Sequence, residues 1–237
     1  MKKSNKILLT YFLFALLAVT AVHVTLYAKY KRGEYVSFDK VREQRMDEIA
    51  LPVVKYVWLT GLQRCTILPA TSTKMKVVKL PGSRMKYNVV NDTLFITGDS
   101  VLTNQNMNEG RRGYQAVNLY LPGTMTINTL FTDLFLNGAP DSTSAQSYVI
   151  NLYGKSSLNT GDMGNKNVYL NGLRVNAVGS TVTFDKETII KDLYLQPSIC
   201  TIYTKTAHIK HFQLKTDSTS TFTFGGNNFK EIEIVKE

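Results

Sequence analysis

Three pairs of adjacent polar residues recur near the end of the chain at a spacing that could bring them to one site. The first member of each pair is a lysine, at Lys191, Lys210 and Lys230. The second members are Asp192, His211 and Glu231. If the three segments stack, the lysines form a cationic strip suited to an anionic glycan. The second column then gathers two carboxylates and an imidazole, the groups of acid–base chemistry.

Two interpretations of these columns differ in function. In the first, the lysines bind an anionic glycan, the outward Tyr194 stacks on a sugar ring, and the second column is an acid–base cluster. Phe135 is a further outward aromatic residue of the repeats. In the second, the columns form an exposed charge lattice in which the acidic residues offset repulsion between stacked lysines. We favour the lattice, because the turns between the segments are only a few residues long and offer no loops to build a catalytic cleft.

The segments that carry these pairs share a pattern: one apolar residue, two of any type, an apolar residue, one of any type, and a final apolar residue. Copies begin at Phe131, Leu170, Ile190, Ile209 and Phe229, with a degenerate copy at Ser147. Successive starts are 16, 23, 20, 19 and 20 residues apart. A second pattern, serine, any residue, apolar, threonine, apolar, begins at Ser180, Ser198 and Ser220. Each repeat therefore contains at least two strands.

Apolar and polar residues alternate with period two inside both patterns, which predicts strands with one buried face. A meandering sandwich would alternate in the same way, but it gives no reason for copies at a fixed offset. Stacked rungs do, because each rung buries the apolar face of the one before it. We therefore predict an all-β fold, a single β-solenoid or β-helix over residues 51–237 with rungs of about 20 residues.

The predicted stack separates the two cysteines. Cys200 takes the apolar position matched by Val182 and Phe222, so it should point inward. Cys65 lies about six rungs earlier, which at ~4.8 Å per rung is roughly 30 Å away. A disulfide needs Cα atoms within about 7 Å of each other. We expect no bond between them.

The N-terminal segment predicts a membrane anchor. Residues 7–28 carry no formal charge, and at 1.5 Å per residue they can cross a hydrocarbon core of ~30 Å as a helix. The alternative is a cleaved signal peptide, for which Val19-Thr20-Ala21 provides small residues at a cut site. We favour the transmembrane helix, because the apolar run continues through Val22, Val24 and Leu26.

The anchor divides the rest of the chain. Residues 1–6 would be a cytoplasmic tail, and residues 29–50 a charge-dense spacer with a short helix over residues 39–49. Basic residues on the two sides of the span nearly balance, so charge does not decide its orientation. The Thr- and Asn-rich β cargo resembles exported domains, which favours a periplasmic location for the bulk of the chain. His23 lies near the outer end of the span, so we interpret it as a residue close to interfacial water rather than a proton-sensitive group.

Charge and motifs exclude several classes of protein. Of the net charge of +10, residues 1–50 account for nine Lys/Arg against five Asp/Glu, which leaves nineteen against thirteen in the remainder. Those basic residues are dispersed apart from Arg111-Arg112, so we expect no nucleic-acid partner. That pair could form an anion-binding turn, although a plain surface loop is the simpler interpretation. Three histidines and two distant cysteines provide no metal site, and no cofactor motif is present.

The first half of the domain contains four strand-like segments: 56–61 (YVWLTG), 65–69 (CTILP), 92–96 (DTLFI) and 117–122 (VNLYLP). In this order they resemble the GIN family of adhesin-head domains, found in envelope proteins of the Bacteroidetes type. The resemblance covers roughly residues 53–237. It implies a β-helical envelope domain, and it has no catalytic residues to carry over. The glycine-rich turns of that family are partly replaced here by Asn, Ser and Thr.

These observations predict a single-pass membrane protein whose β-solenoid acts by non-catalytic binding, scaffolding or adhesion at the cell envelope. Its partners would be the membrane, through residues 7–28, and a polysaccharide or another envelope protein. The alternative is a polysaccharide-processing enzyme, a lyase or hydrolase on a β-helix scaffold.

Overall fold

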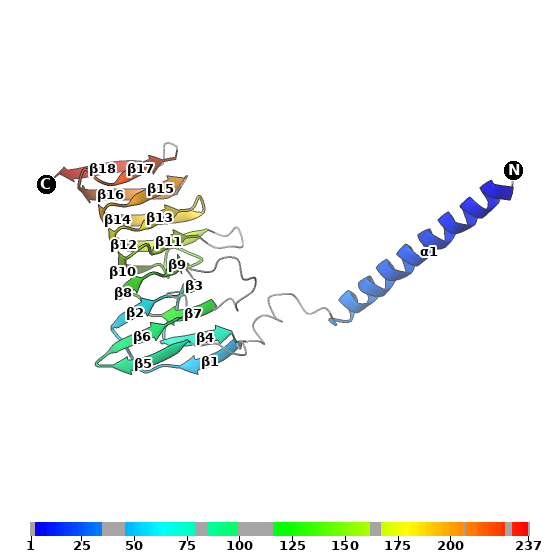
Figure 1. Cartoon of the computed structure of the whole chain (residues 1–237), viewed down its shortest axis with the longest axis horizontal. Helices are drawn as coiled ribbons and strands as arrows, with labels where there is room; N and C mark the ends of the chain where they lie inside the picture. The colour runs from blue at the N-terminus through cyan, green and yellow to red at the C-terminus, as the bar shows by residue number, and fades with distance from the viewer. Residues whose placement is uncertain are drawn as a thin grey trace. The chain divides into compact units, whose positions relative to one another are not determined.

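A computed structural model describes residues 3–34, 46–78, 85–98, 116–161, 167–205, 207–225 and 229–236. The chain divides into two compact units, Met1–Arg45 and Met46–Glu237. The first contains the helix α1 (Lys3–Lys31), and the second contains the strands β1 to β18 (Figure 1).

The helix α1 is apolar along most of its length. Its segment Asn5–Lys31 spans 27 residues and contains an 18-residue window with a mean hydropathy of 2.3, and its large apolar side chains are exposed. Three threonine hydroxyls donate to the carbonyl oxygen four residues earlier, and Nδ1 of His23 lies 2.8 Å from the carbonyl oxygen of Val19. These polar groups are therefore satisfied within the helix. By length and composition α1 can cross a membrane, and an anchor and a signal sequence share those properties.

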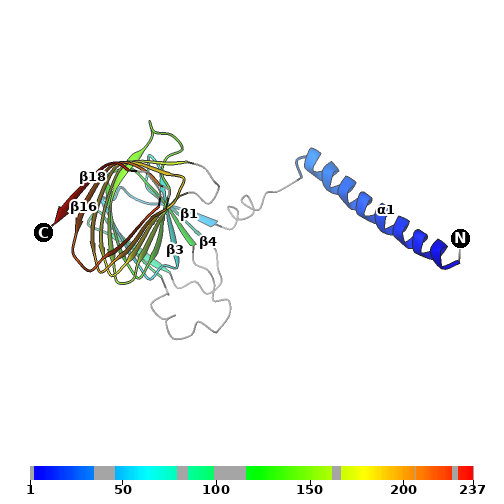
Figure 2. The same ribbon diagram turned by 90° about the horizontal axis from the view of Figure 1, so that it is seen from above.

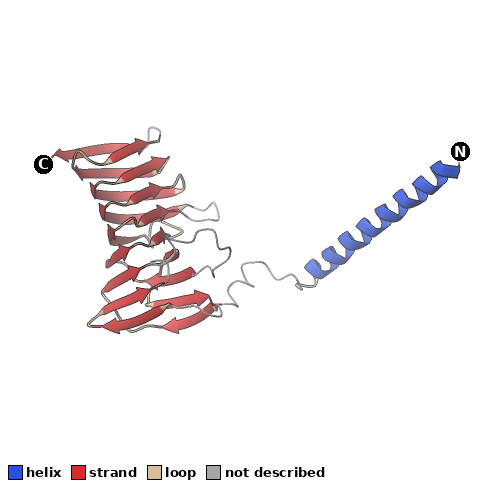
Figure 3. Cartoon of the chain, viewed as in Figure 1, coloured by secondary structure: helices blue, strands red, loops and turns tan. Residues whose placement is uncertain are grey.

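The second unit consists of two long, mostly parallel sheets (Figure 3). Sheet A contains, in spatial order, β1 (Met46–Ala50), β4 (Lys74–Val78), β7 (Ala116–Leu121), β3 (Arg64–Pro69), β9 (Asp133–Leu136), β11 (Ser157–Thr160), β13 (Thr181–Phe184), β15 (Thr201–Lys205) and β17 (Thr221–Phe224). Sheet B contains β18 (Phe229–Lys236), β16 (His208–Thr216), β14 (Thr188–Ser198), β12 (Val168–Val178), β10 (Gln146–Tyr153), β8 (Met125–Leu130), β2 (Tyr56–Thr60), β6 (Thr93–Thr97) and β5 (Lys86–Val90).

From β8 onward, consecutive strands alternate between the two sheets, so each rung contributes one strand to each. Viewed along the stack, the strands of successive rungs superimpose (Figure 2). The predicted solenoid-like β architecture is confirmed at this level. The predicted spacing holds for the last rungs, in which Thr181, Thr201 and Thr221 are in register. The preceding rungs are longer, since Asp133 pairs with Ser157 and Ser157 with Thr181.

The interior is built from columns of like residues. In sheet B one column runs through Leu94, Val57, Ile127, Ile150, Val175, Leu195 and Leu214, and each member is at most 4% exposed. Burying one such side chain contributes roughly 1.5–3 kcal/mol. The alternating burial along each strand is what gives the sheets one dry and one wet face.

A repeated corner joins the sheet B strand of a rung to its sheet A strand. The corner residue has a positive φ in five rungs, at Gly61, Phe131, Lys155, Gly179 and Ile199. A small residue follows it in four of these rungs, Thr132, Ser156, Ser180 and Cys200, whereas Leu62 follows Gly61. Hydroxyl groups of this column accept backbone N–H groups of the neighbouring rung. The hydroxyl of Thr132 accepts the N–H of Leu62 at 3.3 Å, and that of Ser156 accepts the N–H of Thr132 at 3.2 Å. The corner is thus held by a buried column of hydroxyl groups.

The order of rungs in the first half differs from the prediction. The strands β2 and β3 do not begin the stack; they lie between β6 and β7 on one side and β8 and β9 on the other. The early rung is therefore sandwiched between two later ones. Beyond it, β1 pairs antiparallel with β4, and β5 pairs antiparallel with β6. Simple stacking of each rung on its predecessor begins only at β8.

Three predictions of register were wrong. The copy assigned at Phe131 belongs to sheet A, because Phe131 is a corner residue and Leu134 pairs with Leu158. The degenerate copy is displaced by two residues, since Ser147 pairs with Gly172. At Cys200 the displacement is also two residues.

Cys200 stands in the corner column beside Ser180 and Ser220, and its N–H donates to the Ser220 hydroxyl at 3.2 Å. In the sequence pattern Cys200 aligns with Val182 and Phe222, but in the structure Ile202 is the residue that pairs with both. Both cysteines are buried and free. The strands β3 and β15 are four strand steps apart in sheet A, about 19 Å at ~4.8 Å per step, so the distance is shorter than predicted but still too long for a disulfide.

The expected spacer is also shorter than predicted. Residues 46–50 form β1, which pairs with β4. The short helix predicted over residues 39–49 is therefore wrong over 46–49, where the backbone is extended. Residues 39–45 lie outside the described residues.

Candidate ligand-binding groove

The paired polar residues lie at a bend in the sheet B strands. In β14 the burial pattern places Ile190 and Leu193 inside and the two residues between them outside. The same interruption of the two-residue alternation occurs in β12 at Asn171-Gly172. Two consecutive outward residues turn the strand around the core, so the repeated pattern of the sequence encodes a bend rather than a straight strand.

The register brings the second members of the pairs together. Gly172 pairs with Asp192, Asp192 with His211, and His211 with Glu231. Lys191 and Lys210 lie side by side on adjacent strands, because Ile190 pairs with Ile209 just before them and Asp192 pairs with His211 just after them. Of Lys230 and Glu231 only the backbone position in β18 is described.

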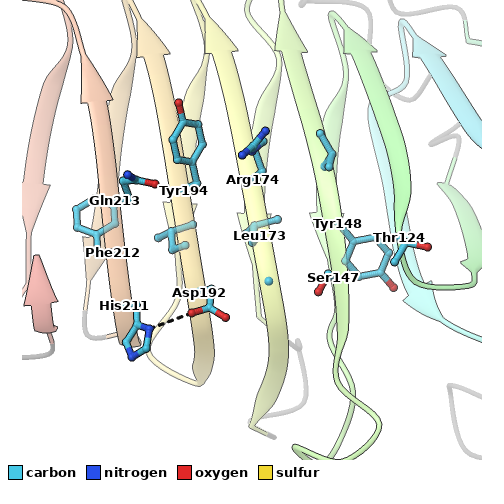
Figure 4. A pocket seen from close by; sticks show the side chains of 13 residues that line it. Thr124, Ser147, Tyr148, Leu173, Arg174, Asp192, Tyr194, His211, Phe212 and Gln213 are labelled. Carbon is cyan, nitrogen blue, oxygen red and sulfur yellow. Dashed lines mark ion pairs between the residues drawn. The ribbon is translucent and has the colours of Figure 1, made fainter. Parts of the chain in front are cut away.

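The two columns line different hollows. Lys191 and Lys210 border a hollow of about 350 Å³ whose floor includes Tyr169 and Ile189. Asp192 and His211 line a larger open groove of about 620 Å³, together with Tyr194 (Figure 4). The structure therefore separates Tyr194 from the lysines with which the sequence grouped it. It brings Tyr194 together with Asp192 and His211 instead.

The groove crosses sheet B from β8 to β16 and presents four kinds of polar group. The Arg174 guanidinium lies 4.6 Å from the centre of the Tyr194 ring. Nδ1 of His211 lies 3.1 Å from Oδ1 of Asp192, an ion pair when the imidazole is protonated. Gln213 contributes an amide beside Tyr194 (Figure 4). Both members of the Asp192–His211 pair are solvated, so the pair contributes little to stability.

Gly172 lies in the middle of the groove lining. A Cβ atom at this position would lie 2.9 Å from the hydroxyl oxygen of Ser147. The Ser147 side chain therefore occupies the space in which a Cβ at position 172 would lie, and Gly172 stands between Ser147 and Asp192 in the same column. Glycine at this position lets Ser147 pack closely against β12.

Other predicted residues lie elsewhere. Phe135 is in β9 of sheet A, where the Arg64 guanidinium stands 4.6 Å from its ring centre. The Arg111-Arg112 pair falls outside the described residues. Within the described ranges, no group of three or more His, Cys, Asp or Glu side chains could hold a metal ion.

Sequence reasoning missed Arg174 and Gly172. Both occupy repeat positions that were visible in the pattern, since Arg174 stands where Tyr194 and Gln213 stand in the next two copies. Comparing that outward column, and not only the two columns of paired residues, would have found the arginine. The glycine gave no chemical signal of its own.

No protein-family model and no curated protein matches this chain, so the expected GIN family is not matched at the level of sequence. Distant structural similarity exists to a "putative lipid binding protein" from Parabacteroides distasonis ATCC 8503, with 10% identity, 81% of this chain and 96% of that chain covered, and a TM-score of 0.35. A "putative adhesin" from Parabacteroides merdae ATCC 43184 gives 8% identity, 80% and 95% coverage, and a TM-score of 0.33. A "putative cell adhesion protein" from Clostridium sporogenes ATCC 15579 gives 10% identity, 81% and 99% coverage, and a TM-score of 0.31. Similarity at this level carries no ligand, activity or site residue across to this chain.

Proposed function

We propose that this chain is a membrane-anchored binding protein of the cell envelope. In this proposal α1 is the anchor, the solenoid lies outside the cytoplasm, and the groove on sheet B holds an extended acidic polysaccharide without cleaving it. Two observations support this proposal: the helix is apolar and long enough to cross a membrane, and sheet B carries an open groove. Protease digestion of spheroplasts with an intact cytoplasmic membrane tests the orientation, since a solenoid outside the cytoplasm is cut without lysis and a cytoplasmic one only after it.

The arrangement of Arg174 and Tyr194 carries the proposal. A guanidinium stacked on an aromatic ring keeps its edge free to bind a carboxylate in a bidentate manner. The ring beside it offers a face for a pyranose. Ser147, Asp192 and Gln213 supply hydrogen-bonding groups for hydroxyls along the same groove. These are the contacts that a chain of uronic acid residues requires.

The groove favours binding over catalysis. Glycoside cleavage by acid–base chemistry generally uses two carboxyl groups about 5–9 Å apart. Among the described side chains that line the groove, Asp192 is the sole carboxylate, and it already faces His211. The connections into β8 and β14 have three residues each, and among the described residues nothing encloses the site from water.

Retention on immobilised polygalacturonate tests this function. The full chain, held in a detergent without a sugar head group, should bind, and Arg174→Ala should weaken binding by about tenfold, the effect of one charge-assisted contact. Arg174→Lys should recover only part of it, because an ammonium lacks the bidentate geometry.

The lysine column is the alternative binding site, and its variant serves as the comparison for Arg174→Ala. The triple variant Lys191→Ala, Lys210→Ala, Lys230→Ala removes the strip that the sequence suggested, yet it leaves the groove intact. If the triple variant abolishes retention and Arg174→Ala does not, the lysine hollow is the site and the groove proposal is wrong.

A second candidate, a polysaccharide-processing enzyme, rests on the Asp192–His211 pair at 3.1 Å in the groove. An imidazole beside a carboxylate can act as a general base. Incubation with polygalacturonate, followed by measurement of new reducing ends and unsaturated ends, separates the two functions. Product formation that is lost in His211→Ala would establish the enzyme, whereas binding without turnover supports the binding protein.

A further inference from the structure

A second part of sheet B is free of charge. The outward residues of the adjacent strands β6, β2, β8 and β10 are all neutral: Thr93, Phe95, Thr97, Tyr56, Trp58, Thr60, Thr126, Asn128, Leu130, Ser147, Val149, Asn151 and Tyr153. Charged residues make up about 25% of typical soluble domains and 19% of this chain, so two or three would be ordinary among these positions. We call this area the neutral face. Its lack of charge disfavours an acidic polymer.

Three aromatic side chains gather on the neutral face. Trp58 pairs in register with Phe95 on the next strand, and its ring centre lies 6.4 Å from that of Tyr153 with an interplanar angle of 18°. Trp58, Phe95 and Tyr153 are 36%, 37% and 39% exposed. Each therefore keeps a substantial part of its ring in contact with solvent. Two nearly parallel rings from β2 and β10, beside a third from β6, form an apolar platform.

An amide ladder continues the platform along the stack. Asn128 pairs in register with Trp58; the amide nitrogen of Asn151 donates to Oδ1 of Asn128 at 2.8 Å, and that of Asn176 donates to Oδ1 of Asn151 at 2.7 Å. The ladder fixes the orientation of each amide. It uses one of the two N–H groups and one acceptor site of Asn151, so the residue retains hydrogen-bonding capacity.

We infer that the neutral face is a second binding site, for a neutral polysaccharide of flat, β-1,4-linked pyranose rings. The C–H faces of such rings stack on Trp58, Phe95 and Tyr153, and their hydroxyl groups bond to the amide ladder. A lipid surface would meet polar amides in the centre of the face, which disfavours it. A chain that lies across the strands meets one column residue per rung, about every 4.8 Å, which is of the order of one sugar ring. The aromatic platform of this site lies on β6, β2 and β10, whereas Arg174 and Tyr194 lie on β12 and β14; the two sites share only border residues, because Asn176 of the ladder is also on β12 and Ser147 and Val149 also line the groove.

The single tryptophan makes this proposal directly measurable. The chain has one Trp, and it is Trp58, so intrinsic tryptophan fluorescence reports this site alone. The full chain, in a detergent without a sugar head group, is titrated with cellohexaose and with chitohexaose. A saturable change in Trp58 emission with at least one of the two is the expected result. No change in emission and no heat of binding with either sugar would overturn the proposal.

The variants Phe95→Leu and Tyr153→Leu remove an aromatic ring but keep apolar volume, so the fold is preserved. Each should weaken binding by about fivefold, the effect of one ring–ring-type contact. Tyr203→Leu is the matched control, because Tyr203 is 40% exposed but lies on sheet A; its affinity should not change. Equal affinity for Phe95→Leu, Tyr153→Leu and the unaltered chain would also overturn the proposal.

The proposals for the groove and for the neutral face can be tested independently of each other. Arg174→Ala should leave the cellohexaose titration unchanged, and Phe95→Leu should leave retention on polygalacturonate unchanged. If Arg174→Ala weakens both ligands equally, one site binds both and the neutral face has no independent role.

Discussion

Replacing Ile199 by glycine should stabilise the solenoid. Ile199 occupies the corner after β14 with φ 56°, a conformation that a β-branched side chain rarely adopts. The same corner position is held by Gly179 with φ 61° in the preceding rung. Ile199 is 66% exposed, so truncation of its side chain removes little burial. Its N–H donates to the Thr219 hydroxyl at 3.1 Å, and glycine retains that bond.

The magnitude follows from two opposing terms. The left-handed conformation costs an ordinary L-residue roughly 1–2 kcal/mol, and glycine avoids that cost. Glycine also gives the unfolded chain more freedom, which costs about 0.5–1 kcal/mol relative to alanine. The expected net gain is about 0.5–1 kcal/mol in the free energy of unfolding. With an m-value of about 2–3 kcal/mol per molar urea, the midpoint should rise by roughly 0.2–0.5 M.

Urea unfolding of the full chain in detergent, followed by the circular dichroism of the β-sheet, measures this gain. Gly179→Ile is the reverse experiment at the matching corner. A Cβ at Gly179 meets no atom within 4 Å, so the loss there comes from the backbone conformation and should be of similar size.

Val178→Gly gives the effect of glycine in an ordinary strand position. Val178 is 47% exposed and lies in β12, where glycine should destabilise by about 0.5–1 kcal/mol. If Ile199→Gly lowers the midpoint as Val178→Gly does, the corner is not strained and the reasoning is refuted.

Two further predictions concern hydrogen bonds in and around the turns. Ser156→Ala should cost about 1–3 kcal/mol, because the buried Ser156 hydroxyl donates to the Tyr153 carbonyl at 2.6 Å and accepts the N–H of Thr132 at 3.2 Å; chemical unfolding measures it. Asp141→Asn should reduce the loss of stability in acid, measured as the melting temperature between pH 5 and pH 2. Hydrogen bonds from Thr143 and its neighbour lower the pKa of Asp141 from 3.8 to about 2, so its contribution is present above pH 4 and is lost as pH falls toward 2.

Matched variants check both predictions. Ser157→Ala removes a solvated hydroxyl that donates to Asp133, and it should cost less than Ser156→Ala. Thr143→Val removes the largest cause of the lowered pKa of Asp141 and should therefore raise that pKa. Equal losses for the two serine variants, or an unchanged acid profile in Asp141→Asn, would contradict the assigned roles.

The regular half of the solenoid was predictable because its signal is local. Copies at Ile190, Ile209 and Phe229 are nearly equally spaced, and those at Ile190 and Ile209 have the bend of two outward residues. Stacked rungs need apolar residues at the same position in every rung, so the apolar pattern of the sequence repeats once per rung. The rungs before them vary in length, and the copies at Phe131 and Ser147 were matched to the wrong register for that reason.

The corners show why register failed at Cys200. Glycine marks the corner at Gly179, but isoleucine stands at the equivalent Ile199. Ser198, which precedes this corner, was therefore aligned with Ser180, which follows the corner at Gly179. Because isoleucine is not a turn-forming residue type, the sequence did not indicate a corner at Ile199.

The groove was only partly predictable. Alignment of the copies correctly grouped Asp192 with His211, because both follow a lysine at the bend. It could not show that the two outward residues of each pair face different hollows. That separation depends on the direction in which the strand bends, which no single residue type encodes.

The position of β2 and β3 between later rungs affects the order in which the protein can fold. These strands end at Pro69, but their neighbours on both sides lie between Thr93 and Leu136. As the chain is synthesised, β2 gains its first neighbour, β6, only about 30 residues after Pro69, β3 gains β7 after about 50, and both strands have neighbours on both sides only after about 70. Such distant pairing slows folding and leaves strand edges exposed meanwhile. The later rungs can add one at a time, whereas the first part of the solenoid closes only as a single unit.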